Sequence, residues 1–271
     1  MSDRDFFLFG DSHYAAIAMA AEARSLPAEK ETDSAGSTFH IFNGWKHDLL
    51  FPFIVARNGE WMLNPRIQAY IESVGQTEPN DIVLSSIFGG GHGHVLGMIS
   101  QGKTDIYLEE FPLPPISEDA RILTRGFIED TFMEYLVSSL EIYSVFRRTF
   151  PDATMIQLEA PPCIGDDDFV QAHMGPWFEA IAKERGGLHL NPPHVRQKFN
   201  WIESQIYRKA AKTENYEFQG SPDECKTSDG FLKPEYYGTD AVHANALYGE
   251  FVIQKLEKRL ETTVTAVRYF G

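Results

Sequence analysis

Short apolar runs alternate with longer stretches of helical periodicity along the chain. The apolar runs predict strands at residues 6–9, 38–43, 81–88, 154–158 and, more weakly, 188–190. The periodic stretches predict helices at residues 15–24, 65–74, 117–150, 169–185, 195–212 and 244–260. Strands that alternate with helices favour a doubly wound α/β fold, in which crossover helices join parallel strands.

Two features of this pattern bear on where a ligand could bind. The helical stretch 117–150 carries an apolar stripe that we expect to be buried, formed by Phe127, Phe132, Tyr135, Leu136, Leu140, Tyr143 and Phe146. Residues 107–117, with three prolines, and residues 214–234 are predicted to be loops, and either could flank a pocket. Because ligands bind beyond the carboxyl ends of parallel strands, the residues that follow each strand are the candidates for function.

Composition supports one globular domain over residues 1–271. The hydrophobic fraction of 43% is ample for a packed interior, and a chain of 271 residues can form a single α/β domain. The net charge of −15 opposes nucleic acid and anionic membranes as partners. The longest apolar runs are too short for membrane insertion, and the first is too short for a signal peptide, so we expect a cytoplasmic protein.

The two cysteines, Cys163 and Cys225, do not have the spacing of a metal-ligand pair. They fit a reducing compartment, and the sequence leaves a disulfide open.

The first chemical motif is Gly10-Asp11-Ser12-His13, directly between the first predicted strand and an alanine-rich helix. A serine there would lie in a tight turn at the edge of the sheet, with helix N–H groups directed toward a bound ligand. That is a suitable position for a nucleophile. The competing interpretation is that Ser12 or Asp11 only caps the helix, and this motif alone does not distinguish the two.

A second motif, the segment 238–245 with Asp240 and His243, stands just before the last predicted helix. A serine hydroxyl becomes a strong nucleophile when an imidazole takes its proton, and a carboxylate fixes the tautomer of that imidazole. Three positions apart in a turn, Asp240 and His243 can supply both groups. The sequence therefore predicts a catalytic triad of Ser12, His243 and Asp240.

The layout of these motifs resembles that of the SGNH/GDSL hydrolases, which have a Gly-Asp-Ser block after the first strand and an Asp-x-x-His block before the final helix. Pro161-Pro162 and residues 230–234 are similar to a bacterial branch of that superfamily. The resemblance implies a three-layer α/β/α, flavodoxin-like fold with a parallel central sheet. It also implies hydrolysis of esters or thioesters through an acyl-enzyme, without a metal or other cofactor.

Two further blocks of that family supply a glycine and an asparagine that stabilise the oxyanion. Gly44 fits the glycine block, whereas Gly91 stands where the family has its asparagine. Backbone N–H groups, or the ring N–H of His92 or His94, are the candidate replacements. Asp11 and His13 are predicted to support the site from behind the reacting groups.

The leading interpretation is a serine hydrolase that acts on a small or carbohydrate-borne acyl ester, and the sequence does not indicate its oligomeric state. One alternative is a ligand-binding protein on the same scaffold, in which the missing asparagine reflects lost catalysis. Another is a metal-dependent phosphoesterase, because Asp11-x-His13 and His92-x-His94 resemble metallophosphoesterase motifs. The order of the blocks differs from that family, so we assign no metal site.

Overall fold

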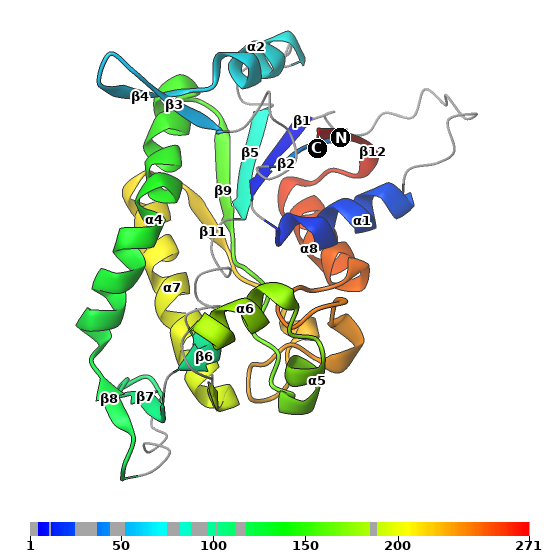
Figure 1. The fold of residues 1–271 in the computed structure, drawn as a ribbon. Coiled ribbons are helices and arrows are strands. Elements are labelled where there is room, and N and C mark those ends of the chain that lie inside the picture. The colour runs from blue at the N-terminus through cyan, green and yellow to red at the C-terminus, as the bar shows by residue number, and fades with distance from the viewer. Residues whose placement is uncertain are drawn as a thin grey trace.

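The computed structural model describes residues 5–10, 12–24, 37–43, 52–74, 82–87, 97–100, 102–111, 118–184 and 189–270. Six parallel strands form the main sheet, in the order β11-β9-β5-β1-β2-β12 (Figure 1). They are β1 (Asp5–Gly10), β2 (Ser37–Asn43), β5 (Ile82–Ile87), β9 (Thr154–Leu158), β11 (Glu217–Gln219) and β12 (Val264–Phe270). Without β12, the chain order across the sheet is 2-1-3-4-5, which is the flavodoxin-like arrangement. The predicted fold class is confirmed.

Helices cover both faces of the sheet, which gives three layers (Figure 1). On one face lie α1 (Tyr14–Arg24) and α8 (Ala246–Leu260), and on the other lie α4 (Arg125–Thr149) and α7 (Pro193–Thr213). Side chains of β1 alternate between the two cores, as expected for a strand buried on both faces. Phe6 and Leu8 belong to the core beneath α1 and α8, whereas Phe7 and Phe9 belong to the core beneath α4 and α7.

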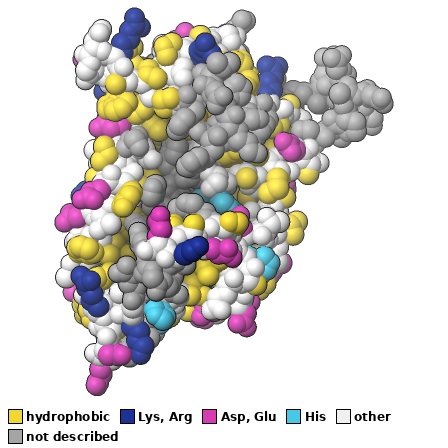
Figure 2. All heavy atoms as spheres, viewed as in Figure 1, with side chains coloured by type: hydrophobic (Ala, Val, Ile, Leu, Met, Phe, Trp, Pro, Cys, Tyr) yellow, Lys and Arg dark blue, Asp and Glu magenta, His cyan; other side chains and the backbone are white. Residues whose placement is uncertain are grey.

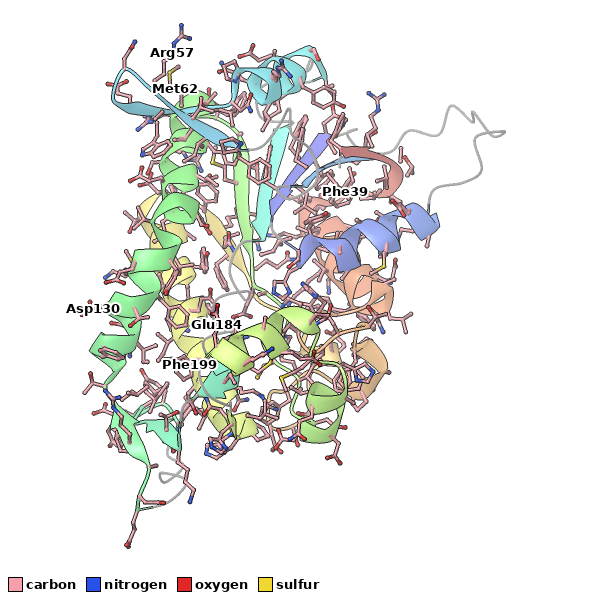
Figure 3. All side chains as sticks on the ribbon, in the orientation of Figure 1. Phe39, Arg57, Met62, Asp130, Glu184 and Phe199 are labelled. Atoms are coloured by element: carbon pink, nitrogen blue, oxygen red, sulfur yellow. The ribbon has the colours of Figure 1, made fainter. Side chains whose placement is uncertain are left out.

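Both cores contain aromatic pairs, and Figure 3 labels one member of each of two pairs, Phe39 and Phe199. Phe39 of β2 stacks on Phe6, with 5.0 Å between ring centroids. In the other core, Phe199 of α7 meets Phe132 of α4 edge to face at 6.3 Å. Such pairs contribute roughly 0.5–1.5 kcal/mol beyond the burial of their area. The first pair joins β1 to β2 within the sheet, and the second joins α4 to α7 within one helix layer.

The helices α1 and α8 pack with their backbones in close contact. A Cβ atom on Gly249 of α8 would overlap the backbone of Ala16 and Ile17 in α1, so only glycine fits at this crossing. Arg24 at the end of α1 forms ion pairs with Glu250 and Glu257 of α8, and the hydrogen bond to Glu250 raises the pKa of Arg24. The elements that follow Ser12 and His243 are therefore held together along their length.

Three expectations about strands were wrong or incomplete. Of the strand predicted at 188–190, the described part is β10 (His189–Leu190), which pairs antiparallel with β6 (Ile99–Ser100) and not with the main sheet. The fifth strand of the flavodoxin-like order is instead β11, within the predicted loop 214–234. The sixth strand, β12, follows the last predicted helix and pairs with β2. At three residues, β11 is too short to show a periodic signal.

Two predicted helices also required correction. The stretch 117–150 becomes helical only at Arg125, because Thr124 accepts a hydrogen bond from Phe127 N as an N-cap. Phe127 and Tyr135 do not belong to the buried stripe, since their exposed fractions are 54% and 52%. The stretch 169–185 divides into α5 (Asp167–Ala172) and α6 (Pro176–Glu184) at a glycine-proline pair.

The remaining described elements surround this framework. Helix α2 (Pro65–Val74) has its predicted bounds, and the hairpin of β3 (Ile54–Arg57) and β4 (Glu60–Leu63) turns at Asn58 and Gly59, both with positive φ. Strands β7 (Thr104–Ile106) and β8 (Arg121–Leu123) pair in parallel, and η2 (Asp223–Cys225) and η3 (Pro234–Tyr236) precede α8. Acidic and basic side chains are interspersed over the face in Figure 2. Within the described ranges, no helix combines the length and apolarity needed to cross a membrane.

Candidate active site

Ser12 lies in the turn between β1 and α1. The strand ends at Gly10, the helix begins at Tyr14, and Ala15 N donates to Ser12 O at 3.2 Å. Strand β1 is central in the sheet, between β5 and β2. Ser12 is therefore held at the carboxyl edge of the sheet, where doubly wound folds bind their ligands.

Asp240 and His243 lie in a short loop between η3 and α8. One carboxylate oxygen, Asp240 Oδ1, accepts hydrogen bonds from Val242 N and His243 N, both at 2.9 Å. The other, Oδ2, lies 2.6 Å from His243 Nδ1. The carboxylate thus holds the loop by two backbone hydrogen bonds and lies beside Nδ1 of the imidazole. This contact places the proton of the neutral ring on Nδ1.

The other ring nitrogen of His243 faces Ser12. His243 Nε2 lies 2.6 Å from Ser12 Oγ, although 231 positions separate the two residues in the chain. With its proton on Nδ1, the ring can accept the proton of the serine hydroxyl at Nε2. The structure therefore brings together in one line the three side chains that the sequence singled out as a triad.

The charge of Asp240 suits this arrangement. Burial alone would raise the pKa of the carboxyl, but the hydrogen bonds from the His243 ring and from Val242 N outweigh it. The pKa of Asp240 is consequently held well below its usual range. The group is a stable anion beside His243, ready to stabilise a positive charge on the imidazole.

Comparison with known proteins finds similarity to solved structures described as esterases and lipases. No protein-family profile matches the sequence, and no curated protein matches it. The similarity to known proteins is therefore found in the comparison of solved structures alone.

Three of those structures span nearly the whole chain. A Streptococcus pneumonia protein named for platelet activating factor is 13% identical, covering 96% of this chain and 85% of its own, with a TM-score of 0.46. Est24, a carbohydrate acetylesterase from Sinorhizobium meliloti, is 14% identical and covers 96% and 99%, with a TM-score of 0.41. A GDSL-like lipase from Bacteroides thetaiotaomicron is 12% identical and covers 95% and 87%, with a TM-score of 0.41. At these identities and TM-scores the matches carry no argument about chemistry, which rests on the side chains of this chain.

His13, predicted to support the site, lies next to the imidazole of His243. Its side chain is buried, and the two ring centroids are 4.9 Å apart with their planes tilted by 48°. His13 thus lies against the His243 ring and outside the line from Ser12 to Asp240. This position suits packing of the ring that must hold its orientation.

The other predicted site residues, Asp11, Gly44, Gly91, His92 and His94, lie outside the described residues. Their roles stay predictions.

The described ends of the neighbouring strands bear on those predictions. Gly10 of β1 is level with Asn43, the last residue of β2, and with Ile87, the last residue of β5. The chain therefore leaves all three strands at the same edge of the sheet.

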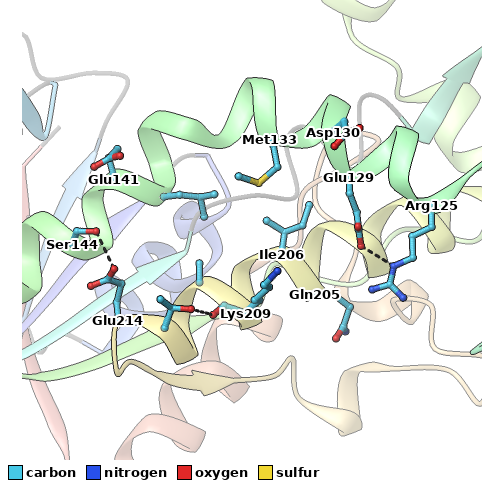
Figure 4. Close-up of a pocket in the computed structure, with 13 residues that line it drawn as sticks. Arg125, Glu129, Asp130, Met133, Glu141, Ser144, Gln205, Ile206, Lys209 and Glu214 are labelled. Carbon is cyan, nitrogen blue, oxygen red and sulfur yellow. Dashed lines mark hydrogen bonds and ion pairs between the residues drawn. The ribbon is translucent and has the colours of Figure 1, made fainter.

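A groove of about 720 Å³ lies between α4 and α7 (Figure 4). Its lining comes from those two helices and from Glu214, which directly follows α7, and it includes an ion pair of Arg125 with Glu129 and a hydrogen bond from Ser144 to Glu214. No side chain of the Ser12 turn or the His243 loop contributes to it. Across the described ranges, no group of three or more His, Cys, Asp or Glu side chains is arranged to hold a metal ion.

Two residues of the His243 loop escaped the sequence analysis. Gly238 N donates to His243 O at 2.7 Å, and a Cβ atom on Gly238 would lie 2.6 Å from that oxygen. Asn245 binds both the loop and the start of α8. Asparagine before a helix is a readable capping signal, but the contacts with the loop leave no trace in the sequence.

Proposed function

We propose that the protein is a serine hydrolase of the SGNH/GDSL type that cleaves acyl esters through an acyl-enzyme. The observation that carries the proposal is the line of short contacts from Ser12 Oγ to His243 Nε2 and from His243 Nδ1 to Asp240 Oδ2. A serine with a capping role alone needs no imidazole at its hydroxyl. An imidazole with a carboxylate behind it is the arrangement that activates a serine.

In the first half of the reaction, His243 Nε2 takes the proton of Ser12 as Oγ attacks the acyl carbonyl carbon. The carbonyl π electrons move to oxygen, which becomes the oxyanion of a tetrahedral intermediate. When the intermediate collapses, the bond to the alcohol oxygen breaks, and His243 passes its proton to that leaving oxygen. Asp240 stabilises the imidazolium while it carries the proton.

In the second half, water replaces the alcohol. His243 takes a proton from the water, whose oxygen attacks the acyl carbon, and the ester bond to Ser12 Oγ then breaks. The proton returns to Ser12, and the carboxylic acid leaves. Gly44 N–H, the backbone of Gly91, and His92 or His94 are the proposed oxyanion donors.

The proposed substrates are small or carbohydrate-borne acyl esters. Ser12 attacks the acyl carbonyl and His243 protonates the leaving group, so the triad itself places no requirement on the rest of the leaving group. A panel of aryl, alkyl and sugar acetates, with thioesters beside them, would therefore identify the preferred leaving group.

The decisive test is labelling with a fluorophosphonate probe alongside hydrolysis of p-nitrophenyl acetate. We expect the protein to label and to hydrolyse the ester, and Ser12→Ala to lose both while it melts cooperatively like the wild type. Ser73→Ala, on the exposed end of α2, is the matched control and should retain both activities.

Two other outcomes would replace the proposal. Absence of serine-dependent turnover on every ester and thioester would favour a ligand-binding protein. Hydrolysis of phosphoesters that a chelator abolishes and Ser12→Ala spares would favour the metal-dependent phosphoesterase.

A further inference from the structure

One side chain closes the loop that carries Asp240 and His243. Asn245, at the end of the loop, donates from Nδ2 to Glu235 O at 2.9 Å and to Tyr237 O at 3.0 Å. Both of these carbonyls lie at the start of the loop. The two hydrogens of the amide therefore join the exit of the loop to its entry.

The oxygen of the same amide caps the following helix. Asn245 Oδ1 accepts hydrogen bonds from Leu247 N at 2.9 Å and Tyr248 N at 3.3 Å, two of the N–H groups in the first turn of α8. Reversing the amide would set its NH2 group against these two donors and its oxygen against two carbonyls. The orientation of Asn245 is thus fixed from both sides.

Backbone contacts complete this closure. Asn245 N donates to Tyr236 O at 3.0 Å, and Gly238 N donates to His243 O at 2.7 Å. Tyr237 and Ala244 face each other as an isolated antiparallel bridge. Asp240 and His243 therefore project from a loop whose base is tied at several points, and the Asn245 side chain bonds to both the loop entry and α8.

The helix that Asn245 caps is also the element that packs on the helix behind Ser12. Gly249, one turn into α8, lies against Ala16 of α1, and α1 begins two residues after Ser12. A shift of α8 relative to the loop would move the imidazole relative to the serine. The Asn245 side chain is hydrogen-bonded to both the loop entry and α8.

We propose that Asn245 is the positioning residue that keeps His243 Nε2 on Ser12 Oγ by locking the His243 loop to the start of α8. The inference rests on the proposed hydrolase function. Asn245 touches neither Ser12 nor a reacting atom, so its contribution is geometric. Displacement of a catalytic group by about 1 Å can cost on the order of 100-fold in turnover, which makes the loss of such a lock measurable.

The informative variant is Asn245→Ser. Serine is also a good N-cap and can keep the bonds to Leu247 N and Tyr248 N, but it is too short to donate to both Glu235 O and Tyr237 O. Asn245→Ala removes the cap and the loop bonds together. Thr124→Ala is the matched control, because it removes an N-cap bond from α4, away from the site.

We expect Asn245→Ser to lower kcat for p-nitrophenyl acetate about 10- to 100-fold with KM within roughly twofold of the wild type. Its melting temperature should fall no further than that of Thr124→Ala, which should keep full kcat. A second readout is the low-field proton NMR signal of His243 Nδ1–H bound to Asp240, recorded in the Ser12→Ala background. In Asn245→Ser this signal should shift or broaden, because a loosened loop exposes the hydrogen bond to solvent.

The inference is overturned if Asn245→Ser keeps kcat within twofold and leaves the NMR signal in place. It is also overturned if Asn245→Ser and Asn245→Ala lose activity only in proportion to the fraction unfolded. Failure of the hydrolase proposal is a separate result, because Ser12→Ala would then leave turnover unchanged. The NMR signal would still report whether Asn245 orients His243.

Discussion

Replacing Asp240 by asparagine should move the proton of neutral His243 from one ring nitrogen to the other, while the shape of the loop stays nearly the same. Asp240 accepts three hydrogen bonds, two from backbone N–H groups at Oδ1 and one from the His243 ring at Oδ2. If the asparagine oxygen takes the Oδ1 place, both backbone bonds survive. In the opposite orientation both backbone hydrogen bonds would be lost, which would cost roughly 0.5–1.5 kcal/mol of folding stability for each bond.

The favoured orientation therefore points the new NH2 group at His243 Nδ1. That nitrogen must then accept, so the proton of the neutral ring moves to Nε2, which can no longer take the proton of Ser12. In serine hydrolases this exchange lowers kcat by roughly 10⁴-fold, which is about 5.4 kcal/mol of transition-state stabilisation. We expect a loss of about 10³- to 10⁴-fold for Asp240→Asn, with KM little changed.

The assay is steady-state hydrolysis of p-nitrophenyl acetate, with the rate of fluorophosphonate labelling measured in parallel. Both should slow together, because both require the activated oxygen of Ser12. Asp223→Asn is the control for a carboxylate-to-amide change, since the Asp223 side chain is exposed and pairs with its neighbour Lys226. Retention of more than a tenth of wild-type kcat by Asp240→Asn would refute the tautomer argument.

Two further predictions concern stability. The pKa of Asp240 is lower in the folded than in the unfolded chain, so its stabilising effect is present above the unfolded value of about 3.9 and is lost as the pH falls toward the folded value. The wild type should therefore melt at a higher temperature than Asp240→Asn at pH 7, and this difference should become smaller below about pH 4. A difference in melting temperature that stays constant from pH 7 to pH 3 would contradict the lowered pKa of Asp240. Replacing a glycine inside a helix by alanine usually stabilises a protein by roughly 0.5–1 kcal/mol. Gly249→Ala should instead lower the melting temperature, because the new methyl group would overlap the backbone of Ala16. An unchanged or raised melting temperature would show that α1 and α8 can move apart at little cost.

The sequence predicted those parts of the fold that rest on local pattern. Strands buried on both faces appear as short apolar runs, so β1 and β9 were found within one residue of their bounds. The proline at position 65 marked the start of α2 correctly. By contrast, β11 and β12 take their places in the sheet through pairing with distant strands, which a local pattern does not report.

Errors on the long helix α4 have a related cause. Residues three or four positions apart share a face of a helix, and Ile128, Phe132 and Leu136 form the buried stripe of α4 in this way. Phe127 lies five positions before Phe132, on a different side of the helix, and is exposed. Burial depends on which element covers a face, and that is decided by tertiary structure.

The candidate site shows the same division between short motifs and long-range packing. Ser12, Asp240 and His243 could be proposed because each sits in a short motif beside a predicted element, and a doubly wound fold brings the carboxyl ends of its strands to one edge. The distance of 2.6 Å between Ser12 Oγ and His243 Nε2 depends instead on the contact of α8 with α1 at Gly249 and on the closed base of the loop at Asn245. The contacts of Gly249 and Asn245 involve residues other than the three reacting ones. The motifs supply the chemical groups, and tertiary contacts that a local pattern does not report bring those groups within bonding distance.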